Sequence, residues 1–184
     1  MGQGDELQLF EREGARWVKS ERAARYLVAR ELNPSECAAM IPYFGEDVLL
    51  KARVQHTAII PNPDFYVTLE AQGIPIPLDF SREMAALTLL DCILVAESKV
   101  GAGQLPLRLL FHELVHVVQY RLLGEDEFMR RYVYGWAANG RQYTRIPIEV
   151  QAYSLEARFA GNPSVDFSVE DFVRANPPGI GGLS

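Results

Sequence analysis

The 184-residue sequence predicts an α+β fold with one strongly apolar helix, a small mixed or antiparallel sheet packed on it, and further helices at both ends. Two observations carry this prediction. Stretches near both ends show the three- and four-residue spacing of apolar side chains that is typical of helices, whereas the middle contains short apolar runs separated by Pro and Gly. Apolar residues make up 48% of the chain, enough for a core, so we expect residues 1–44 to form a helical arm of the same compact unit as a domain over residues 45–184.

The N-terminal part is expected to contain two helices that serve packing alone. Residues 1–11 are expected to be poorly ordered, and apolar residues that alternate with charged ones predict a helix over residues 12–32. Asn33 is the expected N-cap of a second helix, with Glu36 as its capping-box partner. This second helix is expected to end near Pro42.

The middle of the chain is expected to supply the sheet. Residues 48–56 alternate between apolar and polar types and predict a strand. Between this strand and residue 80, turn-forming residues break the chain into short extended pieces: Pro61, Pro63, Gly73, Pro75 and Pro77. Residues 84–96 predict a pair of strands that turns near Leu90 and Asp91, although their periodicity also allows a helix.

An apolar helix is predicted from Pro106 to Gly124. Pro106 suits a first helical turn, and Gly124 suits the end of a helix. Polar residues interrupt the segment too often for a membrane span: Arg108, His112, Glu113, His116, Gln119 and Arg121. The core of the domain is therefore expected to form around this helix.

Three further elements are expected after this helix. Residues 125–137 are amphipathic, and Asn139 and Gly140 form a turn. Pro147 opens a helix that places on one face Glu149, Tyr153 and Glu156. Ser168 and Asp171 cap a short last helix, and residues 176–184 are expected to fray.

His112, Glu113 and His116 form an H-E-x-x-H motif inside the apolar helix. The spacing of four places the two imidazoles one turn apart on the same face, where they could bind one Zn²⁺. Glu113 would then lie beside the ion and act on its water molecule. The alternative is a core helix whose histidines bind backbone carbonyls, but two histidines that flank this glutamate favour the metal.

A catalytic zinc site normally has three protein ligands and an open position. The extended motif with a third histidine on the same helix is absent, since Gln119 and Leu122 occupy its positions. Glu149, 33 residues after His116 and in the first turn of its helix, is the expected third ligand, although such a carboxylate can also serve the helix dipole. Glu156 is the reserve, and the weaker candidates are His56, Glu125, Asp126 and Glu127.

Tyr153 and Tyr143 are candidates for a hydrogen-bond donor to the oxyanion that forms during hydrolysis. Tyr153 lies one helical turn beyond Glu149, and Tyr143 precedes the same helix. A half-buried packing role with the hydroxyl in water is the alternative for each of them.

The residues FHELVHVVQYRLLG, the aromatic residues of EFMRRYVYG and the segment IPIEVQAY resemble small bacterial H-E-x-x-H metallopeptidases of the gluzincin type. The similarity is greatest to the metallopeptidase family also called the core domain of extracellular contractile injection systems, and it covers roughly residues 45–160. It implies a zincin-like fold, with zinc on His112, His116 and Glu149 and with Glu113 as the base. Gln151 departs from the family pattern, which has an acidic residue there, but this position is expected to lie behind the ligands.

The overall composition limits the possible partners. The net charge of −6 argues against nucleic-acid binding, which normally uses a basic surface. Cys37 and Cys92 form no C-x-x-C pair, so neither a disulfide framework nor a cysteine zinc site is expected. The N-terminal residues lack the pattern of a signal peptide, so a cytoplasmic location is expected, with export by another route left open.

These residues predict a zinc-dependent metallopeptidase that acts on a peptide or protein substrate. The first alternative is a binding or assembly module that keeps the fold and cleaves nothing. The second is a structural zinc site, but such a site would need a fourth ligand and would have no need for Glu113.

Overall fold

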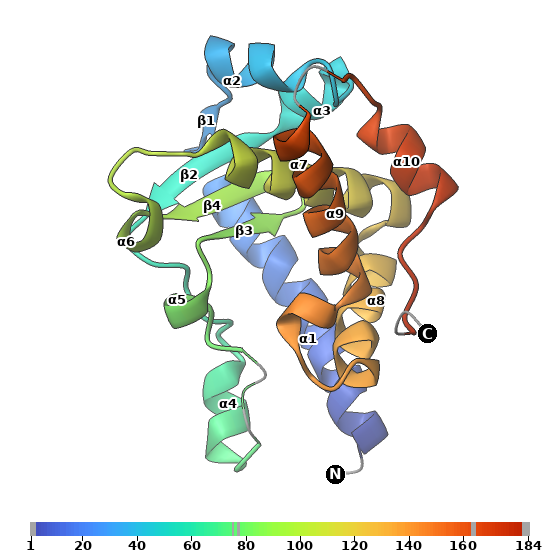
Figure 1. Cartoon of the computed structure of the whole chain (residues 1–184). Coiled ribbons are helices and arrows are strands. Elements are labelled where there is room, and N and C mark those ends of the chain that lie inside the picture. The colour runs from blue at the N-terminus through green and yellow to red at the C-terminus, as the bar shows by residue number, and fades with distance from the viewer. Residues whose placement is uncertain (1–2, 75, 77, 163–164, 182–184) are drawn as a thin grey trace.

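The structure is a computed structural model that describes residues 3–74, 76, 78–162 and 165–181. Helices dominate, and they surround one small sheet (Figure 1). In chain order the elements are α1 (Gln3–Arg25), β1 (Arg30–Glu31), α2 (Pro34–Met40), α3 (Glu46–Lys51), β2 (Arg53–Thr57), α4 (Tyr66–Ala71), α5 (Phe80–Glu83), β3 (Ala86–Leu89), β4 (Cys92–Ala96), α6 (Glu97–Val100), α7 (Leu107–Leu123), α8 (Glu125–Ala138), η1 (Tyr143–Arg145), α9 (Pro147–Gly161) and α10 (Val169–Ala175).

The sheet is mixed and has the strand order β1-β2-β4-β3. β2 and β4 are parallel, and β1 and β3 pair antiparallel with β2 and β4 respectively. β3 and β4 form a hairpin whose turn contains Leu90, with φ +61°, and Asp91. The predicted α+β class and the strand pair within residues 84–96 are therefore confirmed.

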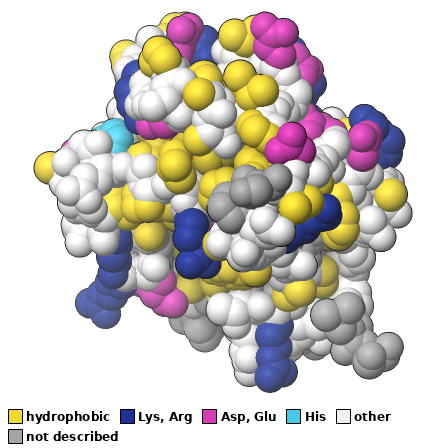
Figure 2. Space-filling view, turned by 45° about the horizontal axis from the view of Figure 1, so that its top comes forward, with side chains coloured by type: hydrophobic (Ala, Val, Ile, Leu, Met, Phe, Trp, Pro, Cys, Tyr) yellow, Lys and Arg dark blue, Asp and Glu magenta, His cyan; other side chains and the backbone are white. Residues whose placement is uncertain are grey.

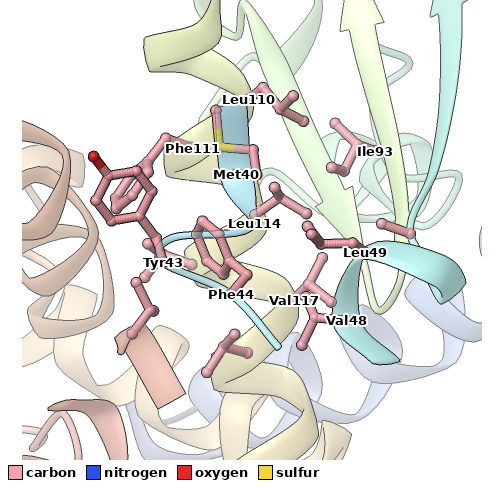
Figure 3. Close-up of a cluster of buried hydrophobic side chains, with 14 of the residues drawn as sticks. Met40, Tyr43, Phe44, Val48, Leu49, Ile93, Leu110, Phe111, Leu114 and Val117 are labelled. Atoms are coloured by element: carbon pink, nitrogen blue, oxygen red, sulfur yellow. The ribbon is translucent and has the colours of Figure 1, made fainter. Parts of the chain in front are cut away.

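Both faces of the sheet are covered. Successive side chains of β4 enter two different core clusters, because side chains alternate across a strand. Ile93 lies in the cluster that contains much of α7, and Leu94 lies in the cluster that contains much of α1 and α8. The first cluster includes Phe111 of α7 together with Met40 and Leu49 (Figure 3). Helix α7, which carries the motif, therefore packs against the sheet on one side and against other helices on its remaining surface.

The first helix differs from its predicted bounds. α1 begins at Gln3 and ends at Arg25, so the expected disorder of residues 1–11 is wrong for residues 3–11, and residues 1–2 lie outside the described residues. Leu7 and Phe10 extend the buried face of the helix by two turns. The predicted continuation of the helix to residue 32 is also wrong, because β1 pairs with β2 instead.

The region between residues 46 and 83 also differs from the prediction. The expected strand over 48–56 begins as helix α3, which buries Val48 and Leu49, and only then becomes β2. Helices α4 and α5 occupy parts of the segment that was expected to be extended, and Asp79 caps α5 by accepting a hydrogen bond from the Ser81 N–H. The expected breaks at residues 75 and 77 lie outside the described residues.

The local signals in the remainder of the chain are confirmed. Asn33 and Glu36 form the expected capping box, and Gly124 ends α7 with φ +79°. Pro147 is in the first turn of α9, and the Ser168 side chain accepts a hydrogen bond from the Asp171 N–H. The predicted fraying of residues 176–184 is wrong for the described part, since Arg131 donates a hydrogen bond to a carbonyl at position 178, and residues 182–184 lie outside the described residues.

The helices and one face of the molecule can be compared with what a membrane span or a basic binding surface would need. None of the helices within the described residues is both long and apolar enough to cross a bilayer. On the face shown in Figure 2, basic and acidic side chains lie around a centre with exposed hydrophobic groups. The described residues form no continuous basic area on that face.

Candidate metal centre

His112 and His116 face one another from adjacent turns of α7. Both side chains are buried, with 5% of their surface exposed, and their Nε2 atoms are 3.1 Å apart. The four-residue spacing in a regular helix produces this arrangement, and the packing of α7 between the sheet and α9 removes it from bulk water. Two ring nitrogens therefore converge on one small region.

Glu149 reaches the same region from the first turn of α9. Its Oε2 atom lies 3.3 Å from Nε2 of His112 and 3.4 Å from Nε2 of His116. The position of α9 depends on a close approach to α8, because a Cβ atom on Gly135 would lie 2.8 Å from Cδ of Pro147. The glycine thus allows the first turn of α9, and with it Glu149, to approach α7.

The geometry of the three atoms fits a metal ion. His112, His116 and Glu149 form a buried group that could hold one ion. Ligands at about 2.0–2.1 Å from a tetrahedral ion lie about 3.3 Å from one another. The three observed separations of 3.1, 3.3 and 3.4 Å are close to this value, so an ion can bind all three atoms without rearrangement of the helices.

Gln119 sets the tautomer of His116. The Gln119 side-chain N–H groups donate to the carbonyl of Ile148 and to Oε1 of Gln151, so Oε1 of Gln119 faces the imidazole. His116 Nδ1 lies 2.7 Å from this oxygen and must donate its proton to it. In neutral His116 the lone pair is then on Nε2, the atom that faces Glu149, as a metal ligand requires.

The amide chain extends further from the site. Gln151 accepts a hydrogen bond from Gln119 and donates one to the carbonyl of Asn176, so α10 is connected to His116 through two amides. Gln151 is located behind the ligands, as expected. The role of Gln119 was missed by the sequence analysis, and its spacing of three from His116 is the signal that could have revealed it.

Glu156, the reserve ligand, lies on the other side of His112. Its Oε2 atom is 3.3 Å from Nδ1 of His112, the ring nitrogen that faces away from the group of three. The two atoms are close enough for an ion pair but are not aligned for a hydrogen bond. Arg108 donates a 3.0 Å hydrogen bond to Glu156 and holds this carboxylate in place. Glu156 is therefore positioned to orient His112.

Glu113 is buried beside the group and is held by the sheet. The hydroxyl of Thr88 on β3 lies 2.7 Å from Oε2 of Glu113 and 3.1 Å from its backbone carbonyl. Burial raises the pKa of Glu113, while the neighbouring imidazoles and the Thr88 hydrogen bond oppose the increase. Thr88 was not predicted, because its contact with Glu113 joins residues that are 25 positions apart.

The group of three is electrostatically coupled in the absence of an ion. Burial would lower the pKa of His116, but the charge and hydrogen bond of Glu149 raise it to about 9. Burial would likewise raise the pKa of Glu149, but His116 and a hydrogen bond from His112 lower it to about 2. A proton and a cation therefore compete for the same nitrogen atoms.

The two candidate tyrosines occupy different places. Tyr143 lines the same cavity as Glu113 and Glu149, and burial together with the charge of Glu149 raises its pKa well above the usual value. Tyr153 is 41% exposed, and the centre of its ring lies 4.6 Å from that of His112. Burial and the charge of Glu149 also raise the pKa of Tyr153. Tyr143 remains protonated near the site, so it can donate a hydrogen bond there.

The remaining predicted ligands lie elsewhere. His56 is in β2, and its buried Nδ1 atom has no hydrogen-bond partner among the described residues. Glu125 and Asp126 form ion pairs with Lys19, and Glu127 forms ion pairs with Arg130 and Arg131. In the part of the chain that the structure describes, none of these four belongs to the metal-binding group.

A cavity of about 280 Å³ leads to the centre. Glu113, His116 and Glu149 lie on its wall, and the rest of the lining is mainly apolar and aromatic. The exposed side chains of Glu83 and Arg141 also border it, so the cavity connects the buried group to the surface.

Comparisons with protein-family models, with curated proteins and with solved structures found no match to this chain.

Proposed function

We propose that the protein is a zinc-dependent metallopeptidase with a zincin-like fold. The observation that carries this proposal is the triangle of His112, His116 and Glu149, with edges of 3.1–3.4 Å, next to the buried carboxylate of Glu113. The resemblance of the motif to gluzincin-type peptidases supports the same function. A purely structural metal site would have no use for Glu113 at this place.

The donor set favours zinc. Two imidazole nitrogens and one carboxylate oxygen form the ligand set of several catalytic zinc sites, whereas Mg²⁺ and Ca²⁺ prefer oxygen ligands. His112, His116 and Glu149 supply three ligands, and the cavity beside them leaves room for a water molecule or a substrate. A bound zinc ion would supply Lewis acidity and lower the pKa of a coordinated water molecule to about 7.

The residues of the chain would perform the proton transfers. Glu113 accepts a proton from the attacking water and delivers it to the leaving amine. The raised pKa of the buried Glu113 carboxyl suits a group that must both accept and donate a proton near neutral pH. Tyr143 donates a hydrogen bond to the oxyanion that develops on the scissile carbonyl.

The substrate would lie along β3, which is one of the two edge strands of the sheet. Ala96 donates its N–H to the carbonyl of Ala85, and hydrogen bonding alternates along an antiparallel pair. The backbone groups of Ala86 and Thr88 therefore point away from β4, toward the edge. Both residues also border the cavity, so an extended peptide bound there would pass close to Glu113.

The test combines metal analysis with hydrolysis of a panel of internally quenched peptides. Wild type reconstituted with zinc is expected to retain about one ion per chain. Glu113→Gln is expected to keep the ion, and its rate of hydrolysis is expected to fall by about 10²–10⁴-fold, because the substitution removes only the base. His112→Ala is expected to lose both the bound ion and the hydrolysis.

Glu70→Gln, a substitution of an exposed carboxylate on α4, is the matched control and is expected to leave both properties unchanged. Wild type that retains no metal, or a Glu113→Gln variant with full activity, would contradict the proposal. Retention of the ion without hydrolysis of any peptide would favour the alternative, a binding module that keeps the fold.

A further inference from the structure

The cavity beside the metal centre has walls of a distinct chemistry. Apart from the metal-centre residues, its lining is dominated by aromatic side chains from elements far apart in the sequence: Trp17, Tyr66, Phe80, Phe128, Tyr132 and Trp136. Trp17 of α1 lies 6.0 Å from Phe80 of α5, measured between ring centres. The N-terminal helix, expected to serve packing alone, therefore forms one wall of this cavity.

We propose that this cavity is a substrate-binding pocket for a bulky apolar side chain, preferably an aromatic one, that flanks the cleaved bond. That the occupant is a substrate rests on the proposed peptidase function. The choice of side chain rests on the shape and chemistry of the cavity walls.

The size of the cavity agrees with this choice. A cavity of about 150 Å³ in a protein core can hold a benzene molecule. The present cavity, of about 280 Å³, has room for a phenyl or indole ring together with its methylene group. A methyl group alone would leave most of the space and most of the aromatic wall without contact, and so would gain little binding energy.

The charge distribution disfavours a charged side chain in the cavity. The acidic and basic side chains on its wall lie at two places: Glu113, His116 and Glu149 at the metal centre, and the exposed Glu83 and Arg141. The guanidinium carbon of Arg141 lies 4.9 Å from the centre of the Trp136 ring. A charged side chain placed between these two ends would lose its hydration against aromatic rings, which disfavours its binding.

The position of the cavity connects it to the scissile bond. Ala86 and Thr88, the residues whose backbone groups point to the free edge of β3, border the same cavity as Glu113. Side chains of an extended peptide project alternately to the two sides of the strand. One side chain of a peptide paired with β3 can therefore enter the cavity while the adjacent peptide bond faces Glu113.

Occupancy of the cavity can be measured without metal or catalysis. The chain has two tryptophans, and both Trp17 and Trp136 line the cavity, so intrinsic fluorescence reports on it. The probes are the N-acetyl amides of phenylalanine, tryptophan, leucine, alanine and lysine (for the tryptophan amide, its saturation-transfer NMR signal replaces fluorescence). Chelator-treated wild type is expected to bind the aromatic amides saturably and at least tenfold more tightly than the alanine and lysine amides.

Two variants fill the cavity, each from a different helix of its wall. Val18→Phe on α1 and Val133→Phe on α8 place a ring where the ligand would lie, and each is expected to weaken binding of the phenylalanine amide at least tenfold. Val67→Phe adds the same ring at an exposed position of α4 and is the matched control, with unchanged binding. Circular dichroism verifies that each variant is folded, and the selectivity of wild type among the amides provides a test that needs no variant.

The same proteins loaded with zinc are then tested on peptides that differ only in the residue on either side of the cleaved bond. Higher kcat/KM for phenylalanine than for alanine or lysine at one of these positions, reduced in Val18→Phe and retained in Val67→Phe, supports the pocket. Equal binding of all amides by wild type, or unchanged binding in both filled variants, overturns it. Selective amide binding without any hydrolysis supports the pocket and rejects the proposed peptidase function, so the two failures are distinguishable.

Discussion

The Thr88 hydroxyl lies 2.7 Å from Oε2 of Glu113, and this contact connects the edge strand of the sheet to the candidate base. The carboxylate would otherwise have freedom to rotate in a cavity of about 280 Å³. Thr88 does not touch the metal-binding atoms, so we assign it as a positioning residue for Glu113.

Replacement of Thr88 by Val is expected to lower kcat about tenfold, since a base held in the wrong orientation transfers protons less efficiently. KM and zinc content are expected to be unchanged, because the ligands remain and Val has nearly the same shape as Thr on the cavity wall. Thr88→Ser, which keeps the hydroxyl, is expected to restore most of the rate. A Thr88→Val variant with the kcat of wild type would show that the Thr88 hydrogen bond does not position Glu113.

Replacement of Gln119 by Leu is expected to lower zinc affinity about 10–100-fold, because His116 loses the acceptor that fixes its tautomer. Competition with a chromophoric chelator measures this affinity. Gln142→Leu, at an exposed position, serves as the control. Equal zinc affinities of wild type and Gln119→Leu would show that His116 binds the ion without a hydrogen bond to the Gln119 amide.

Replacement of Glu149 by Ala is expected to reduce zinc affinity by more than 100-fold, whereas Glu156→Gln is expected to reduce it by about tenfold, since it only orients His112. Arg108→Ala, which removes the partner of Glu156, should resemble Glu156→Gln. The reverse order of the two glutamate variants would move the third ligand to Glu156.

Replacement of Gly135 by Ala is expected to lower both stability and zinc affinity. The added Cβ atom would lie 2.8 Å from Cδ of Pro147 and push the first turn of α9 away, together with Glu149. We expect a loss of about 1–3 kcal/mol in the free energy of unfolding, measured by urea denaturation. Gly161→Ala has open space around its Cβ position and is the control. Unchanged affinity in Gly135→Ala would mean that α9 can move without displacing Glu149.

The capping box at α2 predicts a pH dependence of stability. Burial would raise the pKa of Glu36, but hydrogen bonds from Arg30 and from the Asn33 N–H lower it overall. Because the pKa of Glu36 is lower in the folded state, its charged form stabilises the folded protein. This stabilisation is present above the unfolded pKa of about 4.3 and is lost as the pH falls through the folded pKa. Asn33→Ala is expected to cost about 1 kcal/mol at pH 7.

Urea denaturation at several pH values checks this expectation. Glu36→Gln should be less stable than wild type at pH 7, and the difference should shrink below pH of about 4. A difference that stays constant with pH would assign the effect of Glu36 to packing instead of charge.

The sequence predicted the features that depend on neighbouring positions. The facing of His112 and His116 follows from helical spacing, and the capping box and the first turn of α9 follow from local hydrogen bonding and from Pro147. Glu149 could be proposed because a motif of this kind needs one more ligand, and its position in a first turn marked it out.

The features that depend on tertiary packing were not predictable in the same way. Leu7 and Phe10 extend α1 because they join the core cluster that includes much of α8, where Phe10 lies against Trp136, and nothing in the local pattern distinguishes them from an exposed end. Val48 and Leu49 fit a strand pattern as well as one turn of helix, and their burial in the core beside α7 decided the outcome. Thr88 reaches Glu113 from another element, so its residue type alone did not reveal its role.

The three proposed ligands are distributed unevenly along the chain, with two on α7 and Glu149 on α9. An ion bound to all three would act as a cross-link between these helices that exists only when the protein is folded. Chelation should therefore lower the melting temperature, and zinc at 1,000 times its dissociation constant should add about 4 kcal/mol to the free energy of unfolding. Variation in the supply of the metal would then change how long the folded protein persists as well as how fast it works.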